Sequence, residues 1–379
     1  MRSFQDPERT FAGQPASLGV LLQRVDIGRG QEGLYENQLP QLLQRLAKQT
    51  KVESIKASNA IEGVEVDPDR AEALAGGNPP RFRNRSEKEF AGYADALDAL
   101  MREPDLDPLT VPRLLEFHRK MLAHTDGRGG YLKQEDNKIA NREPDGSTRI
   151  IFEPPSHTET EGLIGGLCAS YEYSLENRVA HPLVLLSAFV LDLLAIHPFL
   201  DGNGRMSRLA TTHELPRLGY GVARYVSVDQ RIYDSKNSYY VALEHSQRKW
   251  HEAEHDIWPW TTYLITVLAE SYDDFEGRVA AGRGSEVGTK QERVRHWILN
   301  EAPSSFRISD VRIAVPGVGD ETIRLTLRKM KGEGLVEPTG TGRAARWRRI
   351  DQVQAPTGGQ PPTERRGGPT RRPRQSLAG

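Results

Sequence analysis

The sequence predicts a mainly helical protein with one small β-hairpin, followed by a C-terminal winged helix-turn-helix. Apolar residues recur at helical spacing through most of the chain up to residue 275. A short segment rich in strand formers, Thr148–Phe152, follows the turn dipeptide Asp145-Gly146. Residues 290–350 contain three short helical patterns and two strand-like segments around a glycine-rich turn. These three observations define the fold class.

The 379 residues allow two or three domains. We expect five segments: an N-terminal arm at 1–36, a helical core at 37–280 that starts with a helix at about 38–62, a linker at 281–289, the winged helix at 290–350, and a disordered basic tail at 351–379. Within the core, the apolar periodicity predicts helices at 38–61, 87–102, 110–123, 159–175, 182–196, from about 205, and at 258–275.

Composition excludes several classes of protein. Cys168 is the single cysteine, so a disulfide framework and a cysteine-based metal site are excluded. The longest apolar run, 182–196, contains Asp192 and is too short to span a bilayer. The first ten residues are polar, without an apolar signal region. We therefore expect a cytoplasmic protein with no membrane partner.

The segment from His197 to Arg208 (HPFLDGNGRMSR) combines features that suit phosphate chemistry. Gly202 and Gly204 can adopt positive φ, which lets consecutive backbone N–H groups point to one side. The helix that follows adds the positive end of its dipole, so the turn predicts a phosphate-binding site. Arg205 and Arg208 are three residues apart and lie on one helix face, where their guanidinium groups suit phosphate oxygens.

Two further side chains complete this group. Asp201 supplies a hard oxygen ligand of the kind that Mg²⁺ uses together with substrate phosphates. His197 ends the preceding helix before Pro198, and its near-neutral pKa suits proton transfer from a hydroxyl. Each feature alone is also typical of an ordinary helix end or turn. Together they indicate phosphoryl-type transfer.

This run resembles the Fic family signature, H-P-F-x-[D/E]-G-N-G-R-x-x-R, at all nine specified positions. The resemblance extends over roughly residues 38–275 and implies a protein adenylyltransferase that moves AMP from ATP to a Ser, Thr or Tyr hydroxyl. It implies that His197 is the base, that Asp201 holds Mg²⁺, and that Phe199 anchors the loop. It also implies phosphate binding by Gly202, Asn203, Gly204, Arg205 and Arg208, with Asn203 and the two glycines at the α-phosphate.

Two neighbouring segments extend the resemblance. Residues 149–155 look like the family's flap, in which Ile150, Ile151 and Phe152 would hold the target by strand pairing. The aromatic stretch after the signature suggests nucleotide-base contacts by Tyr233, Tyr239 and Tyr240, although core packing is the favoured role for Tyr239 and Tyr240.

The residues from Ser58 to Gly63 (SNAIEG) resemble the family's inhibitory motif, [S/T]-x-x-x-E-[G/N]. Glu62 comes at the end of a predicted helix, with Gly63 as its C′ residue. A carboxylate there faces the negative end of the helix dipole, which costs up to ~1 kcal/mol unless a cation compensates. The resemblance assigns Arg208 as that cation, so we expect an autoinhibitory contact.

Residues 290–350 contain 13 Lys and Arg against 7 Asp and Glu. In a winged helix, 321–331 would be the recognition helix, and the wing would carry Arg343, Arg346, Trp347, Arg348 and Arg349. Such a face suits duplex DNA or a protein partner. Two alternatives to an AMP transferase therefore stay open: a DNA-binding regulator that uses the Fic core as a nucleotide sensor, and a Fic transferase of UMP, phosphocholine or phosphate. A homodimer also stays open.

Overall fold

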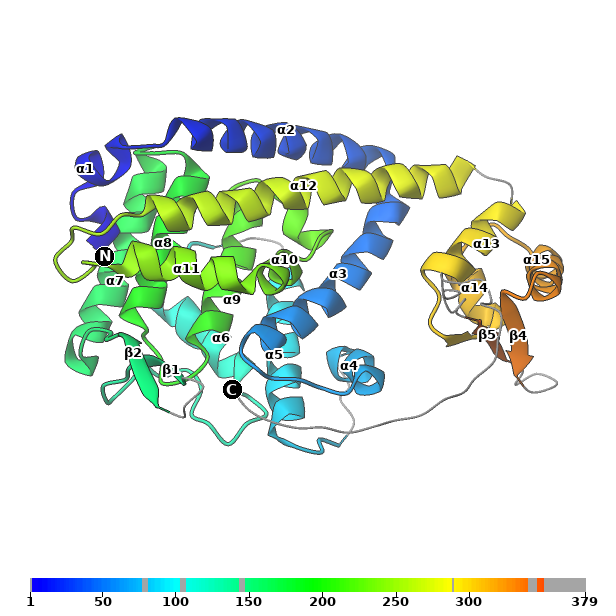
Figure 1. Ribbon diagram of the computed structural model, residues 1–379, viewed down its shortest axis with the longest axis horizontal. Coiled ribbons are helices and arrows are strands. Elements are labelled where there is room, and N and C mark those ends of the chain that lie inside the picture. The colour runs from blue at the N-terminus through cyan, green and yellow to red at the C-terminus, as the bar shows by residue number, and fades with distance from the viewer. Residues whose placement is uncertain are drawn as a thin grey trace, which may run out of the picture. The chain divides into compact units, whose positions relative to one another are not determined.

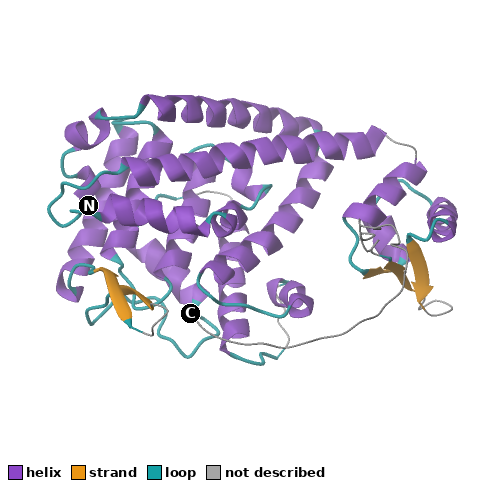
Figure 2. Cartoon of the chain, viewed as in Figure 1, coloured by secondary structure: helices purple, strands orange, loops and turns teal. Residues whose placement is uncertain are grey.

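A computed structural model describes residues 2–76, 81–102, 107–142, 147–287, 290–339 and 346–350. These residues are mainly helical and carry two small antiparallel sheets, which confirms the predicted fold class (Figure 1, Figure 2). The chain divides into two compact units between Gly282 and Arg283, and each unit is described by itself.

The first unit consists of helices around one β-hairpin. Its elements are η1 (Arg2–Phe4), α1 (Pro7–Ala12), α2 (Ala16–Gln38), α3 (Pro40–Ile61), α4 (Pro68–Ala75), α5 (Arg85–Arg102), α6 (Val111–Met121), β1 (Ile139–Arg142), β2 (Thr148–Phe152), α7 (His157–Glu176), α8 (Pro182–Ile196), α9 (Asn203–Arg217), η2 (Val222–Arg224), α10 (Val228–Asp234), α11 (Lys236–Gln247) and α12 (Trp258–Val287). The predicted helices and the hairpin are all present, whereas the helices α1, α2, α4, α10 and α11 were not predicted.

Helix α8 lies in the core of this unit. All of its residues from 183 to 196 are buried, and it packs against α7, α9 and α11. This explains why its sequence is apolar on every side rather than along one stripe. Its buried Asp192 accepts hydrogen bonds from the N–H of Ser3 (3.0 Å), the hydroxyl of Ser3 (2.8 Å) and the indole of Trp250 (2.7 Å).

The segment expected to be an N-terminal arm is instead helical. Helix α2 buries Leu18, Leu22 and Val25 at helical spacing and runs alongside α12 (Figure 1). Farther along α2, Gly28 lies so close to the ring of Tyr272 on α12 that a Cβ atom would overlap it. The apolar stripe of α2 is therefore continued by a glycine, which hides the helical pattern in the sequence of this segment.

The linker expected at 281–289 is also helical as far as Val287, because α12 continues twelve residues beyond the predicted end at 275. Residues 288–289, the tail at 351–379, and the wing turn at 340–345 with Arg343 lie outside the described residues.

In the hairpin, β1 and β2 pair antiparallel, with Asn141 opposite Arg149 and Ile139 opposite Phe152. This pair makes up its whole sheet among the residues that the structure describes, so one edge of β2 has no neighbouring strand there. The predicted β-hairpin is confirmed.

The second unit contains α13 (Lys290–Asn300), β3 (Ser305–Phe306), α14 (Ile308–Ala314), α15 (Asp320–Gly332), β4 (Val336–Thr339) and β5 (Arg346–Arg349). The strands form an antiparallel sheet in the order β3-β5-β4. A separate apolar core, which includes Val294, Ile298, Phe306, Ile323 and Leu327, holds helices and sheet together. The three helices and the pair β4–β5 lie where the sequence predicts them.

In the described parts of the chain, no helix combines the length and the apolar character that crossing a membrane requires.

Candidate active site

The segment predicted to carry the chemistry connects α8 to α9, and residues 197–204 are called the signature loop below. His197 is the C-cap residue of α8 and adopts a left-handed conformation, with φ 50° and ψ 60°. Its N–H still donates to the carbonyl of Leu193 (3.1 Å), so the chain leaves the helix at this residue. A left-handed non-glycine residue is uncommon and persists where its surroundings hold it.

The imidazole of His197 has a defined orientation. Its Nδ1 lies 3.2 Å from the carbonyl oxygen of Leu194, and since a carbonyl only accepts, Nδ1 carries the proton. The lone pair of Nε2 is therefore available to take a proton. Burial lowers the pKa of His197 to about 4, and the positive charge of Lys133 acts in the same direction. The imidazole is thus neutral at physiological pH, as a base must be.

The loop closes on itself through Asn203. The side-chain amide of Asn203 donates to the carbonyl of Phe199 (2.7 Å) and accepts from the N–H of Phe199 (3.0 Å). Phe199 itself is fully buried, as expected for an anchor, and stacks on His118 with ring centroids 3.9 Å apart. The amide that was expected at the α-phosphate therefore shapes the loop, and the backbone N–H groups remain the candidates for phosphate binding.

Helix α9 starts with the geometry of an anion-binding site. Gly202 is its N-cap, with φ 80° and no side-chain cap, so the first N–H groups of α9 lack an intrahelical partner. At Gly204 a Cβ atom would overlap the carboxylate of Glu62. An acidic side chain thus already lies against the place where an anion would bind.

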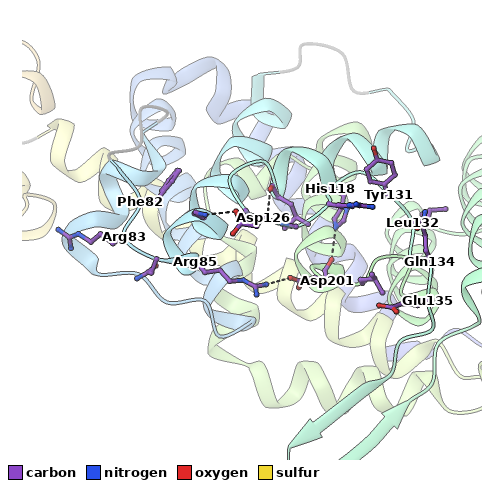
Figure 3. A pocket seen from close by; sticks show the side chains of 17 residues that line it. Phe82, Arg83, Arg85, His118, Asp126, Tyr131, Leu132, Gln134, Glu135 and Asp201 are labelled. Carbon is purple, nitrogen blue, oxygen red and sulfur yellow. Dashed lines mark hydrogen bonds and ion pairs between the residues drawn. The ribbon is translucent and has the colours of Figure 1, made fainter.

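Arg205 and Asp201 belong to a ring of four charges. Arg205 is 1% exposed and pairs with Glu89 on α5 (2.9 Å), and Glu89 in turn pairs with Arg85 (2.6 Å). Arg85 and Arg205 also approach the two oxygens of Asp201, at 3.3 and 3.6 Å. Figure 3 shows Arg85 reaching across to Asp201. Helix α5 therefore holds both side chains in place.

Arg208 is held by the predicted inhibitory motif. Its Nε donates to the hydroxyl of Ser58 (2.7 Å), and its Nη2 donates to the carbonyl of Ser58 (2.9 Å) and to the carboxylate of Glu62 (2.8 Å). Arg208 is 3% exposed, whereas 31% of the Glu62 side chain is exposed. Glu62 is the C-cap of α3 and Gly63 follows with φ 75°, so the expected helix end and the expected pair with Arg208 are both present.

The charges around this pair favour the ionised form of Glu62. Burial raises the pKa of Glu62, but the charge and hydrogen bond of Arg208 outweigh burial, so the pKa is lowered overall. Lys236 adds to this effect and donates to the carbonyl of Ile61 at the end of α3 (2.6 Å). Nearby, burial raises the pKa of Asp229 to about 6 against the opposing charge of Arg208.

The other predicted residues divide into buried and exposed groups. Tyr239 is buried and packs edge-to-face against Trp260 and Tyr263, which fits a packing role. Tyr233 and Tyr240 are 40% and 44% exposed, so the core-packing role favoured for Tyr240 is wrong, although its ring contacts Tyr239 and Lys236.

The flap residues of β2 also differ in exposure. Ile150 is 46% exposed and Ile151 is partly buried. Phe152 is partly buried as well and stacks on the ring of His251, with centroids 5.3 Å apart. The hairpin is thus anchored at Phe152, and its exposed residues lie toward the turn.

At the signature loop, Asp201 is the predicted metal ligand. The described residues contain no group of three or more His, Cys, Asp or Glu side chains that could hold a metal. Asp201 is 52% exposed and lies at the edge of the loop, which fits a Mg²⁺ ion that takes its remaining ligands from phosphates and water.

A cleft of about 1210 Å³ opens beside Asp201 on the side of the loop that faces His118 (Figure 3). Its wall contains the cations Arg83, Arg85, Lys88 and Arg128 as well as the acids Asp126, Glu135 and Asp201. This cleft and the ion pair of Glu89 with Arg205 were not predicted, because no contiguous motif marks them.

Comparison with known proteins agrees with this geometry. Residues 108–215 match the model of the Fic/DOC family. A protein adenylyltransferase Fic of Drosophila yakuba is 27% identical over 169 residues, covering 44% of this chain and 29% of that protein. One of Aedes aegypti is 31% identical over 118 residues, covering 30% of this chain and 21% of that protein. The chain therefore matches less than a third of the length of these relatives.

The fold is also shared with solved structures. A Fic family protein from Desulfovibrio desulfuricans G20 has a TM-score of 0.58 at 22% identity, over 90% of this chain and 98% of that one. Fic-1 from C. elegans has a TM-score of 0.52 at 20% identity, over 69% and 72% of the two chains. With family match, relatives and fold in agreement, this chain carries a Fic/DOC family domain at residues 108–215.

Proposed function

We propose that this chain is a cytosolic protein adenylyltransferase that transfers AMP from Mg-ATP to a Ser, Thr or Tyr hydroxyl of a target protein. The observation that carries the proposal is the neutral His197, whose Nε2 can accept a proton. The same short loop leads from His197 into the N-terminus of α9, the candidate anion site. A base and an anion site on one rigid loop suit attack of a hydroxyl on a phosphate. The names of the curated relatives support the same reaction.

In this reaction the hydroxyl oxygen forms a bond to the α-phosphorus, and the bond between that phosphorus and the bridging oxygen breaks, releasing pyrophosphate. His197 Nε2 takes the hydroxyl proton. The N–H groups of Gly202, Asn203 and Gly204 face the α-phosphate, and Arg205 and Arg208 bind the outer phosphates. Asp201 would hold Mg²⁺, which supplies charge neutralisation when bound.

We propose that Glu62 inhibits the enzyme. It occupies Arg208 and lies against Gly204, so its carboxylate competes with the phosphates for both groups. ATP bound beside Glu62 would have its outer phosphates displaced from their productive position. The unpaired edge of β2, with the exposed Ile150, suits binding of an extended target segment by strand pairing.

The proposal predicts a covalent product of defined mass. Protein incubated with Mg-ATP should gain the mass of AMP on a hydroxyl side chain, detected by mass spectrometry, and Asp201→Asn should lose the reaction together with its Mg²⁺ dependence. Glu135→Gln is a matched control, because Glu135 lines the same cleft and does not belong to the loop. Addition of UMP, phosphocholine or phosphate from the corresponding donors, with none of AMP, would contradict the assignment.

A second candidate function, binding of duplex DNA by the second unit as a winged helix, is favoured by one face of α15. Arg324, Arg328 and Lys331 are exposed there at positions i, i+4 and i+7, with Leu325 exposed beside them. Such spacing places the three cations along one stripe. A basic recognition helix of this kind suits the phosphates and base edges of a major groove.

This candidate predicts a steep salt dependence. The slope of log K against log [salt] should be about −0.9 for each phosphate contact, measured by fluorescence anisotropy on duplex DNA. The double variant Arg324→Ala, Arg328→Ala should bind more weakly with a shallower slope, while AMP transfer is unchanged. A protein that retains no duplex even at low salt would favour docking of a protein partner instead.

A further inference from the structure

Residues 118–137 donate hydrogen bonds to backbone carbonyl oxygens of the signature loop and of Ile196, the residue just before it. The N–H of Lys133 donates to the carbonyl of Pro198 (2.8 Å), and its ammonium donates to the carbonyl of Ile196 (3.2 Å). The side-chain amide of Asn137 donates to the carbonyls of Phe199 (3.0 Å) and His197 (3.5 Å). Lys133 and Asn137 are themselves hydrogen-bonded to each other (3.0 Å).

His118 completes this support. Its Nδ1 accepts from the N–H of Gly130 (3.0 Å), so its Nε2 carries the proton and donates to the carbonyl of Asp201 (3.2 Å). Each carbonyl just described therefore accepts a hydrogen bond from a residue of this segment.

The buried ammonium of Lys133 is a costly way to make these bonds. Lys133 is 3% exposed, and burial lowers its pKa to about 8. Apart from Asn137, the ammonium has one acceptor, the carbonyl of Ile196, and the backbone N–H of Lys133 donates to the carbonyl of Pro198. These two carbonyls flank His197, whose backbone is strained. A buried charge is expensive unless its hydrogen bonds are satisfied, and here they stabilise an unfavourable backbone conformation.

We propose that Lys133 and Asn137 are positioning residues for the base His197: they hold its left-handed backbone and thereby aim Nε2 at the attacking hydroxyl. The inference rests on the proposed function. Neither residue touches the reacting atoms, since both act through the carbonyl oxygens of residues 196–199. The cation of Lys133 has a second effect, because its charge adds to the burial that lowers the pKa of the nearby imidazole.

The test compares Lys133→Met and Asn137→Ala in a Glu62→Gly parent of full length. Both variants should lower kcat for AMP transfer by about 10²-fold, the loss typical of a misplacement of about 1 Å, with the KM for ATP nearly unchanged. Lys120→Met is the matched control: Lys120 lies on α6 and pairs with Glu116 at the surface, so its loss should leave kcat unchanged.

A second measurement separates positioning from general loss of structure. In protein labelled with ¹⁵N-histidine, the His197 resonance is identified by its absence in His197→Ala and titrated. Its pKa should rise in Lys133→Met, because a nearby positive charge is lost, and stay unchanged in Asn137→Ala, because that change is neutral. If Lys133→Met does not fold, the kcat of folded Asn137→Ala decides the outcome.

The proposal is overturned if both variants fold with the parent's Tm and keep its kcat. It is equally overturned if the loss in kcat/KM comes wholly from a higher KM for ATP, because the change then concerns the nucleotide site. A parent protein without AMP transfer would refute the proposed function instead. The titration would still report whether Lys133 lowers the pKa of His197.

Discussion

AMP transfer should fall about 10²- to 10⁴-fold when His197 is replaced by alanine, which is the usual contribution of a general base. The hydroxyl proton then has no acceptor, because the free lone pair on Nε2 is removed. ATP binding should persist, since the imidazole acts on the hydroxyl and the phosphates are bound by the loop backbone and the arginines. Single-turnover rates and calorimetric ATP binding, both measured in the Glu62→Gly background, separate the two effects.

The control and the pH dependence sharpen this prediction. His296→Ala removes an imidazole from the second unit and should leave the rate unchanged. Because the pKa of His197 is about 4, the neutral base persists as the pH falls from 8 to 5, and the rate should drop only as the pH approaches 4. A rate that falls around pH 6.5, or a His197→Ala protein with undiminished transfer, would contradict the assignment.

Replacing Glu62 with glycine should raise the rate of AMP transfer, including self-modification, by roughly 10²-fold or more. The change frees Arg208 and clears the space beside Gly204 without altering the loop. Phosphates can then take their productive position, and a misplacement of about 1 Å is enough to account for a factor of that size. Transfer of labelled AMP at saturating Mg-ATP measures the gain.

Three variants test the cause of this gain. Glu65→Gly changes an exposed acid three residues farther along and should leave the rate unchanged. Glu62→Gln keeps the size of the side chain but removes its charge, so an intermediate rate is expected. The double variant Glu62→Gly, Arg208→Ala should lose the gain, because the freed cation is its source. Equal rates for wild type and Glu62→Gly would make Glu62 an ordinary surface residue.

The pKa of Glu62 also restricts how the inhibition is relieved. Arg208 lowers that pKa below its usual range, so Glu62 is ionised at neutral pH. The stabilisation from this ion pair is complete above the unfolded-state pKa and is lost only as the pH falls through the lower, folded-state pKa. A change of pH within the physiological range therefore leaves the pair with Arg208 intact.

The sequence predicts the parts of this site that are local in the chain. The loop from His197 to Arg208 is one contiguous motif, and Glu62 with Gly63 carries its own helix-end signal. The partners that support the loop are distant: Lys133 reaches the carbonyl of Ile196, 63 residues away, from a segment whose polar composition suggests only a loop. Its role depends on a backbone atom, which no side-chain pattern reveals.

The N-terminal segment was misread for the same reason. Gly28 and Glu32 interrupt the apolar pattern of α2, and both are explained by Tyr272, which lies on α12 and donates to Glu32 from 240 residues away (2.9 Å). Only the tertiary contact shows that Gly28 leaves room for the ring of Tyr272 and that the buried Glu32 accepts a hydrogen bond from the Tyr272 hydroxyl.

The double hydrogen bond between Asn203 and Phe199 means that the loop is ordered before any ligand arrives. An amide presents a donor and an acceptor side by side, as a peptide unit does. The side chain of Asn203 therefore bridges the turn with two hydrogen bonds to the backbone of Phe199. Ordering a flexible backbone costs about 1–2 kcal/mol of conformational entropy per residue. Here folding has already met that cost, and the free energy of nucleotide binding remains available for orienting the phosphates.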